Sequence, residues 1–319
     1  MKVCLVSNHT HPVKLYGGTE RVVEWLAEKL SLFGHHVVLV AQPGSDLPGI
    51  EVRHATDSKT AQALTLDADI VHYHGWLPDD LNPQKPYLYT LHGNEPDISL
   101  LPSITCCISQ NHATRHQRTL FAYNGVDPDE LDFSSRPDDH LLFFSKIRRR
   151  NKGARSAVDL CHAYNQKLTM AGGSRLDLIK VGVFWRSIFD GVTIRGEIGG
   201  AQKAQEFRAA KALLFPINWQ EPFGLVLIEA MMSGTPVIAS RYGSTPELVA
   251  REAGAIYDDP HGFVDALEHA VNLNRITVRD YAITNFSASL MAQTYIRIYE
   301  QILDGTPPHQ LVGSRLITP

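Results

Sequence analysis

The segment Glu221-Pro-Phe-Gly-Leu-Val-Leu-Ile-Glu229 is the most informative stretch of this chain. Its apolar pattern predicts a helix over about residues 225–233, with Glu221 before the helix and Glu229 inside it. The first N–H groups of a helix lack internal partners and attract anions, and Gly224 would let a ligand approach the backbone closely. Two carboxylates placed in this way could hold separate hydroxyl-bearing parts of one extended ligand. A capping Glu221 and a solvent-facing Glu229 would explain the spacing alone equally well.

Short apolar runs alternate with helical patterns on both sides of this segment, along the whole chain. Strands are predicted at residues 3–7, 37–41, 70–73, 87–91, 105–108, 141–145, 167–171, 192–195, 212–216 and 236–240. Helices are predicted at residues 20–33, 153–164, 225–233 and 287–303, and Thr245-Pro246-Glu247 resembles a helix start with a capping hydroxyl. Nearly continuous apolar strands that alternate with helices are typical of buried parallel sheets.

The composition changes to Asn, Gly, Asp, Pro and Ser at residues 123–137, which indicates a domain boundary. We therefore expect an α/β protein of two doubly wound, Rossmann-like domains, residues 1–134 and 135–286. After a further predicted helix at 287–303, residues 304–319 are expected to form a tail. Open parallel sheets bind ligands at the carboxyl ends of their strands, so the site is expected in a cleft between the two domains.

A second notable segment is the basic loop Ser145-Lys-Ile-Arg-Arg-Arg-Asn-Lys-Gly153, between a predicted strand and a predicted helix. Cations together with free helix N–H groups are what a diphosphate requires. A solvated loop is an alternative reading for residues 148–150. A nucleic-acid site is a further alternative, but no other basic surface or aromatic platform accompanies the loop.

The overall composition is that of a globular protein with no strong charge bias. The 319 residues are 44% hydrophobic and 20% charged with a formal net charge of -4, which gives no general attraction to nucleic acid. The four cysteines form no CxxC pair and are expected to be buried thiols in a reducing compartment. No signal peptide or membrane-spanning run is recognised, so a cytoplasmic protein is expected, with peripheral membrane contact left open.

Two histidine pairs, His9 with His11 and His72 with His74, raise the question of a metal site. No further ligands at a recognisable spacing complete either pair, so we expect no metal. The pairs follow predicted strands, where His and Tyr side chains suit recognition of hydroxyl groups. The chain also lacks a Gly-x-Gly-x-x-Gly fingerprint after Val6, a Gly-x-Ser-x-Gly elbow and a Walker A sequence.

Taken together, these motifs resemble the GT4 family of retaining glycosyltransferases, which have the GT-B fold. The resemblance covers nearly the whole chain and is strongest over residues 124–240. It is carried by Asn124-Gly-Val-Asp127, by the basic loop, by residues 193–196 and 213–216, and by the 221–240 segment. Gly17-Gly18 resembles the family's N-terminal glycine loop, and His92 resembles a His at the end of a strand in the first domain. The helix at 287–303 resembles the family's crossing helix, so it is expected to pack back on the first domain.

The resemblance implies a role for each matched residue. In the second domain, Lys152 would hold the donor phosphates, Glu229 the nucleotide ribose, and Glu221 with the Phe223-Gly224 backbone the transferred sugar. In the first domain, Gly18 would contact the diphosphate and His92 would act near the reacting carbon. The implied donor-binding set is Gly17, Gly18, Ser145, Lys146, Lys152, Glu221, Pro222, Phe223, Gly224, Leu225 and Glu229, and the catalytic set is His92, Glu221 and Lys152. Tyr16, His74, Trp76 and Glu95 are candidates for the acceptor side.

Two features depart from the family pattern. Ser145-Lys146 replaces the commoner Gly-Arg pair, and lysine is a point charge where arginine offers a bidentate fork. The chain is also short for the family, which suggests trimmed acceptor loops in its first half.

The resemblance implies a retaining hexosyltransferase that uses a UDP- or GDP-linked sugar without a cofactor or obligatory metal. Its acceptor is not identified by the sequence. The alternatives are a GT-B enzyme of another type, such as an epimerase or a phosphorylase, and an inactive nucleotide-sugar-binding protein.

Overall fold

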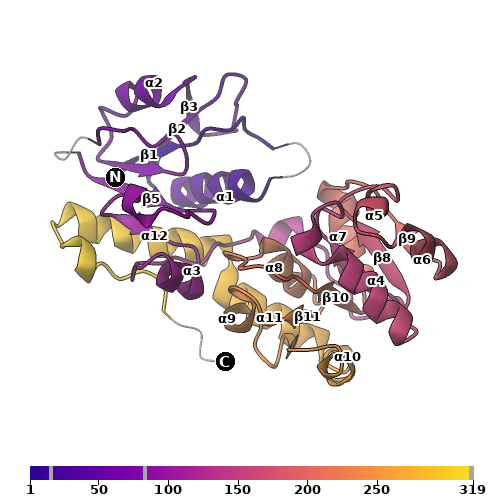
Figure 1. The fold of residues 1–319 in the computed structure, drawn as a ribbon. Coiled ribbons are helices and arrows are strands. Elements are labelled where there is room, and N and C mark those ends of the chain that lie inside the picture. The colour runs from indigo at the N-terminus through magenta and orange to yellow at the C-terminus, as the bar shows by residue number, and fades with distance from the viewer. Residues whose placement is uncertain (14–16, 82–84, 316–319) are drawn as a thin grey trace. The chain divides into compact units, whose positions relative to one another are not determined.

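The computed structural model describes residues 1–13, 17–81 and 85–315, which form two compact units. Unit 1 comprises Met1–Asp127 together with the chain from Phe286 to the end of the described residues. Unit 2 comprises Pro128–Asn285. Each unit contains one sheet with helices packed around it (Figure 1).

Unit 1 is built on a six-stranded parallel sheet in the order β3-β2-β1-β4-β5-β6. Its strands are β1 (Lys2–Val6), β2 (His36–Ala41), β3 (Glu51–His54), β4 (Ile70–Tyr73), β5 (Tyr87–Thr90) and β6 (Thr105–Cys106). Its helices are α1 (Gly18–Leu32), α2 (Ser58–Ala63), α3 (Gln110–Arg115) and α12 (Ala288–Leu303), with short 3₁₀ turns at Ile98–Leu100 and Pro308–Gln310. Helix α12 packs against α1 within this unit (Figure 1).

Unit 2 repeats this strand order with a second six-stranded parallel sheet, β12-β11-β10-β7-β8-β9. Its strands are β7 (Leu141–Phe144), β8 (Leu168–Ala171), β9 (Thr193–Ile194), β10 (Ala212–Phe215), β11 (Val237–Ser240) and β12 (Gly254–Tyr257). Its helices are α4 (Ala154–Ala163), α5 (Asp177–Lys180), α6 (Phe184–Phe189), α7 (Gly200–Ala209), α8 (Leu225–Met232), α9 (Thr245–Leu248), α10 (Gly262–Val271) and α11 (Arg275–Phe286), with 3₁₀ turns at Pro128–Glu130 and Arg150–Lys152.

Both sheets have the doubly wound order in which the chain direction across the sheet reverses next to the first strand. This reversal lies between β1 and β4 in unit 1 and between β7 and β10 in unit 2. The central strands are buried on both faces, as continuous apolar runs require. The predicted fold class, two doubly wound α/β domains, is therefore confirmed.

Several elements differ from the sequence-based expectation. Strands β3 and β12 were not predicted, because each is an edge strand with a short and only partly buried pattern. Helix α9 begins near the expected place, but Thr245 does not cap it. Its hydroxyl donates instead to the carbonyl oxygens of Ser240 (2.6 Å) and Tyr242 (2.9 Å), so it closes the preceding turn.

The units also divide the chain at other residues than the predicted 134/135 and 286/287. The segment after Asp127 packs on unit 2, where Phe133 lies against Gly234 and the Ser134 carbonyl accepts from Arg275 Nε at 2.6 Å. The described part of the expected tail lies along unit 1, where the Ser314 amide donates to the Phe121 carbonyl at 2.8 Å. Among the residues that the structure describes, no helix is both long enough and apolar enough to cross a membrane.

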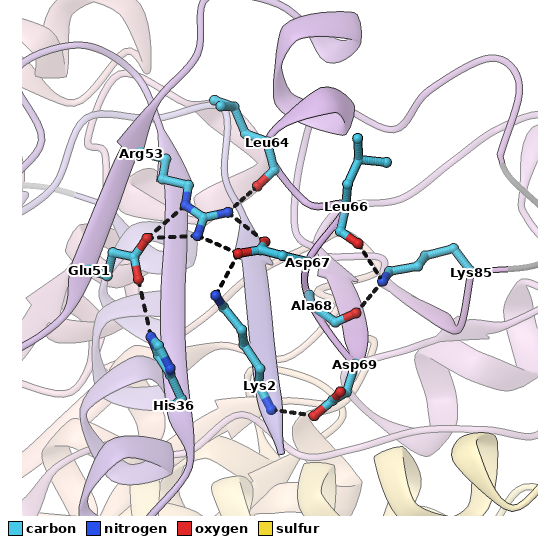
Figure 2. A network of polar contacts seen from close by, with 10 residues as sticks. All are labelled: Lys2, His36, Glu51, Arg53, Leu64, Leu66, Asp67, Ala68, Asp69 and Lys85. Atoms are coloured by element: carbon cyan, nitrogen blue, oxygen red, sulfur yellow. Dashed lines mark hydrogen bonds and ion pairs between the residues drawn. The ribbon is translucent and has the colours of Figure 1, made fainter.

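A polar network ties together the amino-terminal end of the unit 1 sheet (Figure 2). The Arg53 guanidinium contacts both oxygens of Asp67, Nη1 to Oδ1 at 2.7 Å and Nη2 to Oδ2 at 2.8 Å. Lys2 Nζ donates to the same carboxylate at 2.6 Å, and Lys85 Nζ donates to the carbonyls of Leu66 and Ala68. The network therefore fastens the loop before β4 to β1 and β3. The hydrogen bonds from Arg53 hold the pKa of Asp67 well below its ordinary value of 3.8, and the hydrogen bond from Lys2 makes a smaller contribution in the same direction.

We expect Asp67→Asn to reduce the acid sensitivity of folding. A carboxyl group with a depressed folded-state pKa stabilises the protein above its ordinary pKa, and this contribution is lost as the pH falls below that value. The wild-type melting temperature should therefore exceed that of the variant at neutral pH, and the two should converge below about pH 4. Thermal unfolding across this range measures the effect, and a constant difference at all pH values would contradict it.

Candidate functional site

In unit 2, the loops that follow β7 and β10 lie on either side of the point where the strand order reverses. Gly153, in the loop after β7, has a φ of +80°, and a Cβ there would overlap the carbonyl oxygen of Pro216. Only glycine allows this approach, so the basic loop is held against the chain that leaves β10. Ser145 and Ile147 are buried and Lys146 is half-buried, whereas Arg148, Arg149 and Arg150 are exposed.

Lys152 and Glu221 meet where these two loops come together. Lys152 Nζ donates to Glu221 Oε2 at 2.5 Å, and both side chains are largely buried. Trp219 supports the pair from one side, because its Nε1 donates to the same oxygen at 3.0 Å and its ring lies 4.4 Å from the ammonium group. The structure thus brings together two residues that are 69 positions apart in the sequence. Trp219 was not singled out in the sequence, although its position two residues before Glu221 was a usable signal.

The turn from Glu221 into α8 is fixed from behind by the loop after β11. The Ser244 hydroxyl donates to the Phe223 carbonyl at 2.8 Å, and the Ser244 amide donates to the Glu221 carbonyl at 3.1 Å. Phe223 itself is buried, and Gly224 has a φ of +85° directly before Leu225, the first residue of α8. No side chain caps this helix start. Its first amide groups are therefore not bonded by a capping side chain, which suits the approach of an oxygen-rich ligand.

Glu229 lies within α8, as expected, but it is buried and forms an ion pair with Lys203 of α7. Lys203 Nζ bonds Glu229 Oε1, and the two side chains are only 10% and 9% exposed. The sequence reasoning missed Lys203, since helix α7 itself was not predicted. The available signal was a lysine on the same helix face as the buried Ala204 and Phe207. A carboxylate held in place by an adjacent cation can still use its second oxygen to accept a hydrogen bond.

In unit 1, the predicted glycine loop leads directly into α1. Gly18 is the first residue of this helix, and Gly17 precedes it without a side-chain cap. A Cβ on Gly17 would lie 2.6 Å from Glu20 Oε2, so a larger residue there would require the Glu20 side chain to move. Tyr16, a candidate for the acceptor side, lies outside the described residues.

His74 and His92, at the carboxyl ends of β4 and β5, form a hydrogen-bonded pair. His74 Nδ1 and His92 Nε2 lie 2.8 Å apart, and the other nitrogen of the buried His74, Nε2, has no hydrogen-bond partner. Desolvation by burial lowers the pKa of His92 to about 3 and holds the pKa of His74 well below its ordinary value. Both rings are therefore neutral near pH 7, and His74 contacts His92 directly.

A buried network from helix α12 supports this pair. His72 stacks on His74 at a ring-centroid distance of 3.9 Å. The nitrogens of His72 are occupied by Tyr299 OH and Thr90 Oγ1, each at 2.7 Å, and Tyr295 OH lies 3.1 Å from Thr90 Oγ1. The C-terminal helix thus fixes the strand ends that carry the two histidines. The packing of this helix on unit 1 was expected, but no pattern in the sequence indicated which of its side chains reach the strand ends.

The two remaining acceptor-side candidates follow the same strands. Trp76 is half-buried, packs on the unit 1 core and has a φ of +43°, a conformation that is uncommon for a bulky residue. Glu95 is half-buried and accepts from the Asp97 amide at 3.0 Å, while its own amide donates to His116 Nε2 at 3.0 Å. Backbone strain next to a strand end is a frequent property of binding loops, so Trp76 remains a candidate.

The histidine pairs that raised the question of a metal have protein partners for most of their ring nitrogens. His11 bonds Glu24 Oε1 and Ser7 Oγ, each at 2.9 Å. A different group, Cys107, His112 and His116, has ligand atoms within 4.8 Å of one another. There, too, both imidazoles use both nitrogens, with the carbonyls of Gly93 and His112 and with the amides of Ile108 and Glu95. These bonds occupy the lone pairs and N–H positions that an ion would need.

Comparison with known proteins relates this part of the chain to glycosyltransferases. Residues 138–272, which include Lys152, Lys203, Glu221 and Glu229, match the family model described as glycosyl transferases group 1. An uncharacterized glycosyltransferase of Methanocaldococcus jannaschii is 22% identical over 89% of this chain and 92% of its own length. A crystal structure of AviGT4, a glycosyltransferase involved in avilamycin A biosynthesis, aligns with a TM-score of 0.82 at 24% identity over 96% of this chain and 98% of that one. Anabaena HepE in complex with UDP-glucose aligns with a TM-score of 0.70 at 16% identity over 96% and 99% of the two chains.

The two doubly wound units have the GT-B fold of these structural neighbours. The family match over residues 138–272 is in agreement with the GT4 resemblance of the sequence.

We expect Lys203→Met to destabilise the protein by about 3–5 kcal/mol, because it leaves the buried Glu229 carboxylate without its partner. The double variant Lys203→Met/Glu229→Leu should regain most of this loss, since both charges are then removed. Denaturant unfolding of the two variants measures the difference. The exposed pair Arg241 and Asp258 provides a control, because Asp258→Asn should cost less than about 1 kcal/mol. Equal losses for Lys203→Met and Asp258→Asn would contradict burial of the pair.

The histidine network predicts that His72, His74 and His92 remain neutral in the folded protein down to about pH 5. Their ring C–H resonances in NMR spectra should keep the shifts of neutral imidazole through this range. Midpoints near the ordinary value of 6.5 would show that water reaches the rings.

Proposed function

We propose that this protein transfers a sugar from a UDP- or GDP-linked donor to a hydroxyl acceptor with retention of anomeric configuration and without an obligatory metal. The proposal rests mainly on the arrangement of Lys152, Glu221 and Trp219 at the strand-order reversal of unit 2. A cation there adjoins a carboxylate and a helix start with no side-chain cap. These are the groups that a diphosphate and a sugar require side by side.

The known proteins support a nucleotide-linked donor. The HepE structure of the same fold holds UDP-glucose, and a starch synthase structure with a TM-score of 0.71 holds ADP and acarbose. The family match covers the part of the chain that carries all the donor-side candidates from Ser145 to Glu229. The UDP- or GDP-linked donor, the retention of configuration and the hydroxyl acceptor are therefore part of the proposal.

In the proposed reaction, the donor takes the place of the internal ion pair. Lys152 and Lys146 bind the diphosphate, while Glu221 accepts hydrogen bonds from hydroxyl groups of the sugar. Glu229, held by Lys203, accepts from the ribose. A cation preorganised next to the leaving diphosphate stabilises the charge that develops there, which is commonly the largest catalytic contribution in such sites.

The proposed reaction is a single substitution at the anomeric carbon, without a covalent intermediate on the protein. The acceptor oxygen forms a bond to the anomeric carbon on the face from which the diphosphate departs, and the bond from that carbon to the phosphate oxygen breaks. The acceptor proton passes to the departing diphosphate. Gly18 and His92 of unit 1 keep the roles that the family resemblance implies, contact with the diphosphate and action near the reacting carbon.

Lys152→Met should lower kcat/KM by about 10²–10³-fold, because the developing phosphate charge loses its cation. Glu221→Gln should cause a comparable loss by changing the group that receives the sugar. Arg149→Gln is the matched control, since it removes an exposed cation from the same loop and should leave activity within about twofold. Activity of Lys152→Met equal to that of the wild type would refute the assignment.

A screen of UDP-, GDP- and ADP-sugars by thermal shift, with and without EDTA, identifies the donor. A ligand that binds only the folded state raises the melting temperature, and the rise should persist in EDTA. Transfer to an acceptor is then followed by mass spectrometry, and NMR of the new anomeric proton reports the configuration. An epimerase would change the donor sugar alone, a phosphorylase would require inorganic phosphate, and an inactive binding protein would show a thermal shift without turnover or donor hydrolysis.

A further inference from the structure

The short helices α5 and α6 of unit 2 expose an unusual set of apolar side chains. They lie side by side near β9 (Figure 1). We define the α5–α6 patch as the exposed residues Leu176, Ile179, Trp185, Ile188 and Phe189. Trp185 is 69% exposed and Phe189 is 83% exposed, so their rings extend into solvent. Isolated exposed apolar residues are common, but five within 14 successive positions, on two helices that contact each other, are a concentration of the kind that marks an interaction site.

The local fold holds these rings outward. The Arg175 guanidinium donates to the carbonyls of Ser187 (3.0 Å) and Val192 (2.6 Å), which fixes α6 against the end of α5. Ser187 and Val183 face the core, so the opposite side of α6, with Trp185, Ile188 and Phe189, faces solvent. The packing of Val183 and Ser187 in the core, together with the hydrogen bonds of Arg175, therefore keeps the patch exposed.

Cationic side chains border the patch. A hollow of about 370 Å³ lies next to Ile179 and is lined by Arg150, Arg155 and Lys180, among other residues. Arg150 reaches the Lys180 carbonyl at 3.3 Å, and Arg186 bonds the Asp159 carboxylate, which Arg155 also contacts at 3.4 Å. One carboxylate thus faces two arginines. Asp177 of α5 and Asp190 at the end of α6 add two further carboxylates. The region therefore keeps a positive excess in a protein whose net charge is -4, because its five cations (Arg150, Arg155, Arg175, Lys180 and Arg186) outnumber these three carboxylates.

We propose that the α5–α6 patch docks on the surface of an anionic lipid bilayer. Trp185 and Phe189 would enter the interfacial layer, while Arg150, Arg155 and Lys180 would contact lipid phosphates. Amphipathic aromatic rings with adjacent cations are the combination that binds such interfaces. A fluid bilayer accepts protruding side chains without a preformed complementary pocket. This inference does not depend on the proposed sugar-transfer chemistry.

Charge argues against a second copy of this chain as the occupant. A two-fold symmetric contact places the same surface on both sides of the interface. The positive excess of one copy's border would then lie in the same interface as the positive excess of the other. An anionic bilayer instead complements both the apolar centre and the cationic border.

Co-sedimentation of the full chain with vesicles tests the proposal. Vesicles of phosphatidylcholine mixed with phosphatidylglycerol should bind the protein at least about tenfold more tightly than pure phosphatidylcholine, and high salt should weaken binding. Trp185→Ser/Phe189→Ser should reduce binding to the mixed vesicles by at least about tenfold. Arg155→Gln/Lys180→Gln should reduce it by a similar factor, since each cation near an anionic surface contributes about fivefold.

The control variant is Leu66→Ser/Leu100→Ser, which removes two comparably exposed apolar residues from unit 1 and should bind like the wild type. Unchanged melting temperatures and unchanged thermal shifts with the donor nucleotide separate loss of docking from loss of folding or of donor binding. The proposal would be overturned if the wild-type protein did not bind anionic vesicles, or if it bound both vesicle types equally. Full binding by either patch variant would also overturn it. A dimer that is detected by light scattering and abolished by Trp185→Ser/Phe189→Ser would overturn it in favour of self-association.

Discussion

The close approach of Gly153 to Pro216 is the constraint on which the candidate site in unit 2 depends. It holds the loop after β7 against the loop after β10 at the point where the strand order reverses. A side chain at residue 153 would separate these loops, and Lys152 could no longer reach Glu221. The ion pair between Lys152 and Glu221 can therefore form only because residue 153 is a glycine. Parallel strands with both faces covered make this geometry rigid, because their buried apolar runs fix where each strand ends.

Electrostatic pairs then position the two carboxylates of the Glu221–Glu229 segment. Glu221 is held by Lys152 and Trp219, and Glu229 by Lys203. Burying a carboxylate without a partner is costly, so each carboxylate is accompanied by a lysine. An arrangement in which charges neutralise one another before a ligand arrives can exchange those contacts for contacts with the ligand. This property suits a site that is proposed to receive and release a charged diphosphate.

His72, His74 and His92 of unit 1 follow a different principle, because burial keeps these three rings neutral. Their order comes from hydrogen bonds that reach from helix α12 through His72 to the His74–His92 pair. The C-terminal helix is thus part of the support of these strand ends as well as a cover for the sheet. In unit 2, α5 and α6 show the opposite situation, in which apolar side chains remain outside the core and a positive border surrounds them.

The sequence by itself determined the fold class, the central strands and the helices α1, α4, α8 and α12, whereas α7, α10 and α11 were not predicted. Continuous apolar runs and helical periodicity are local signals, so β4, β7 and α8 could be predicted within a residue or so. The edge strands β3 and β12 escaped because partial burial leaves a weak pattern. The spacing from Glu221 to Glu229 likewise placed one carboxylate before a helix and one within it. Tertiary structure alone decided which cation accompanies each carboxylate, that His74 contacts His92, and that Trp185 and Phe189 stay exposed. These outcomes depend on packing between segments far apart in the chain, and no local pattern encodes which distant side chain will fill the space next to a given residue.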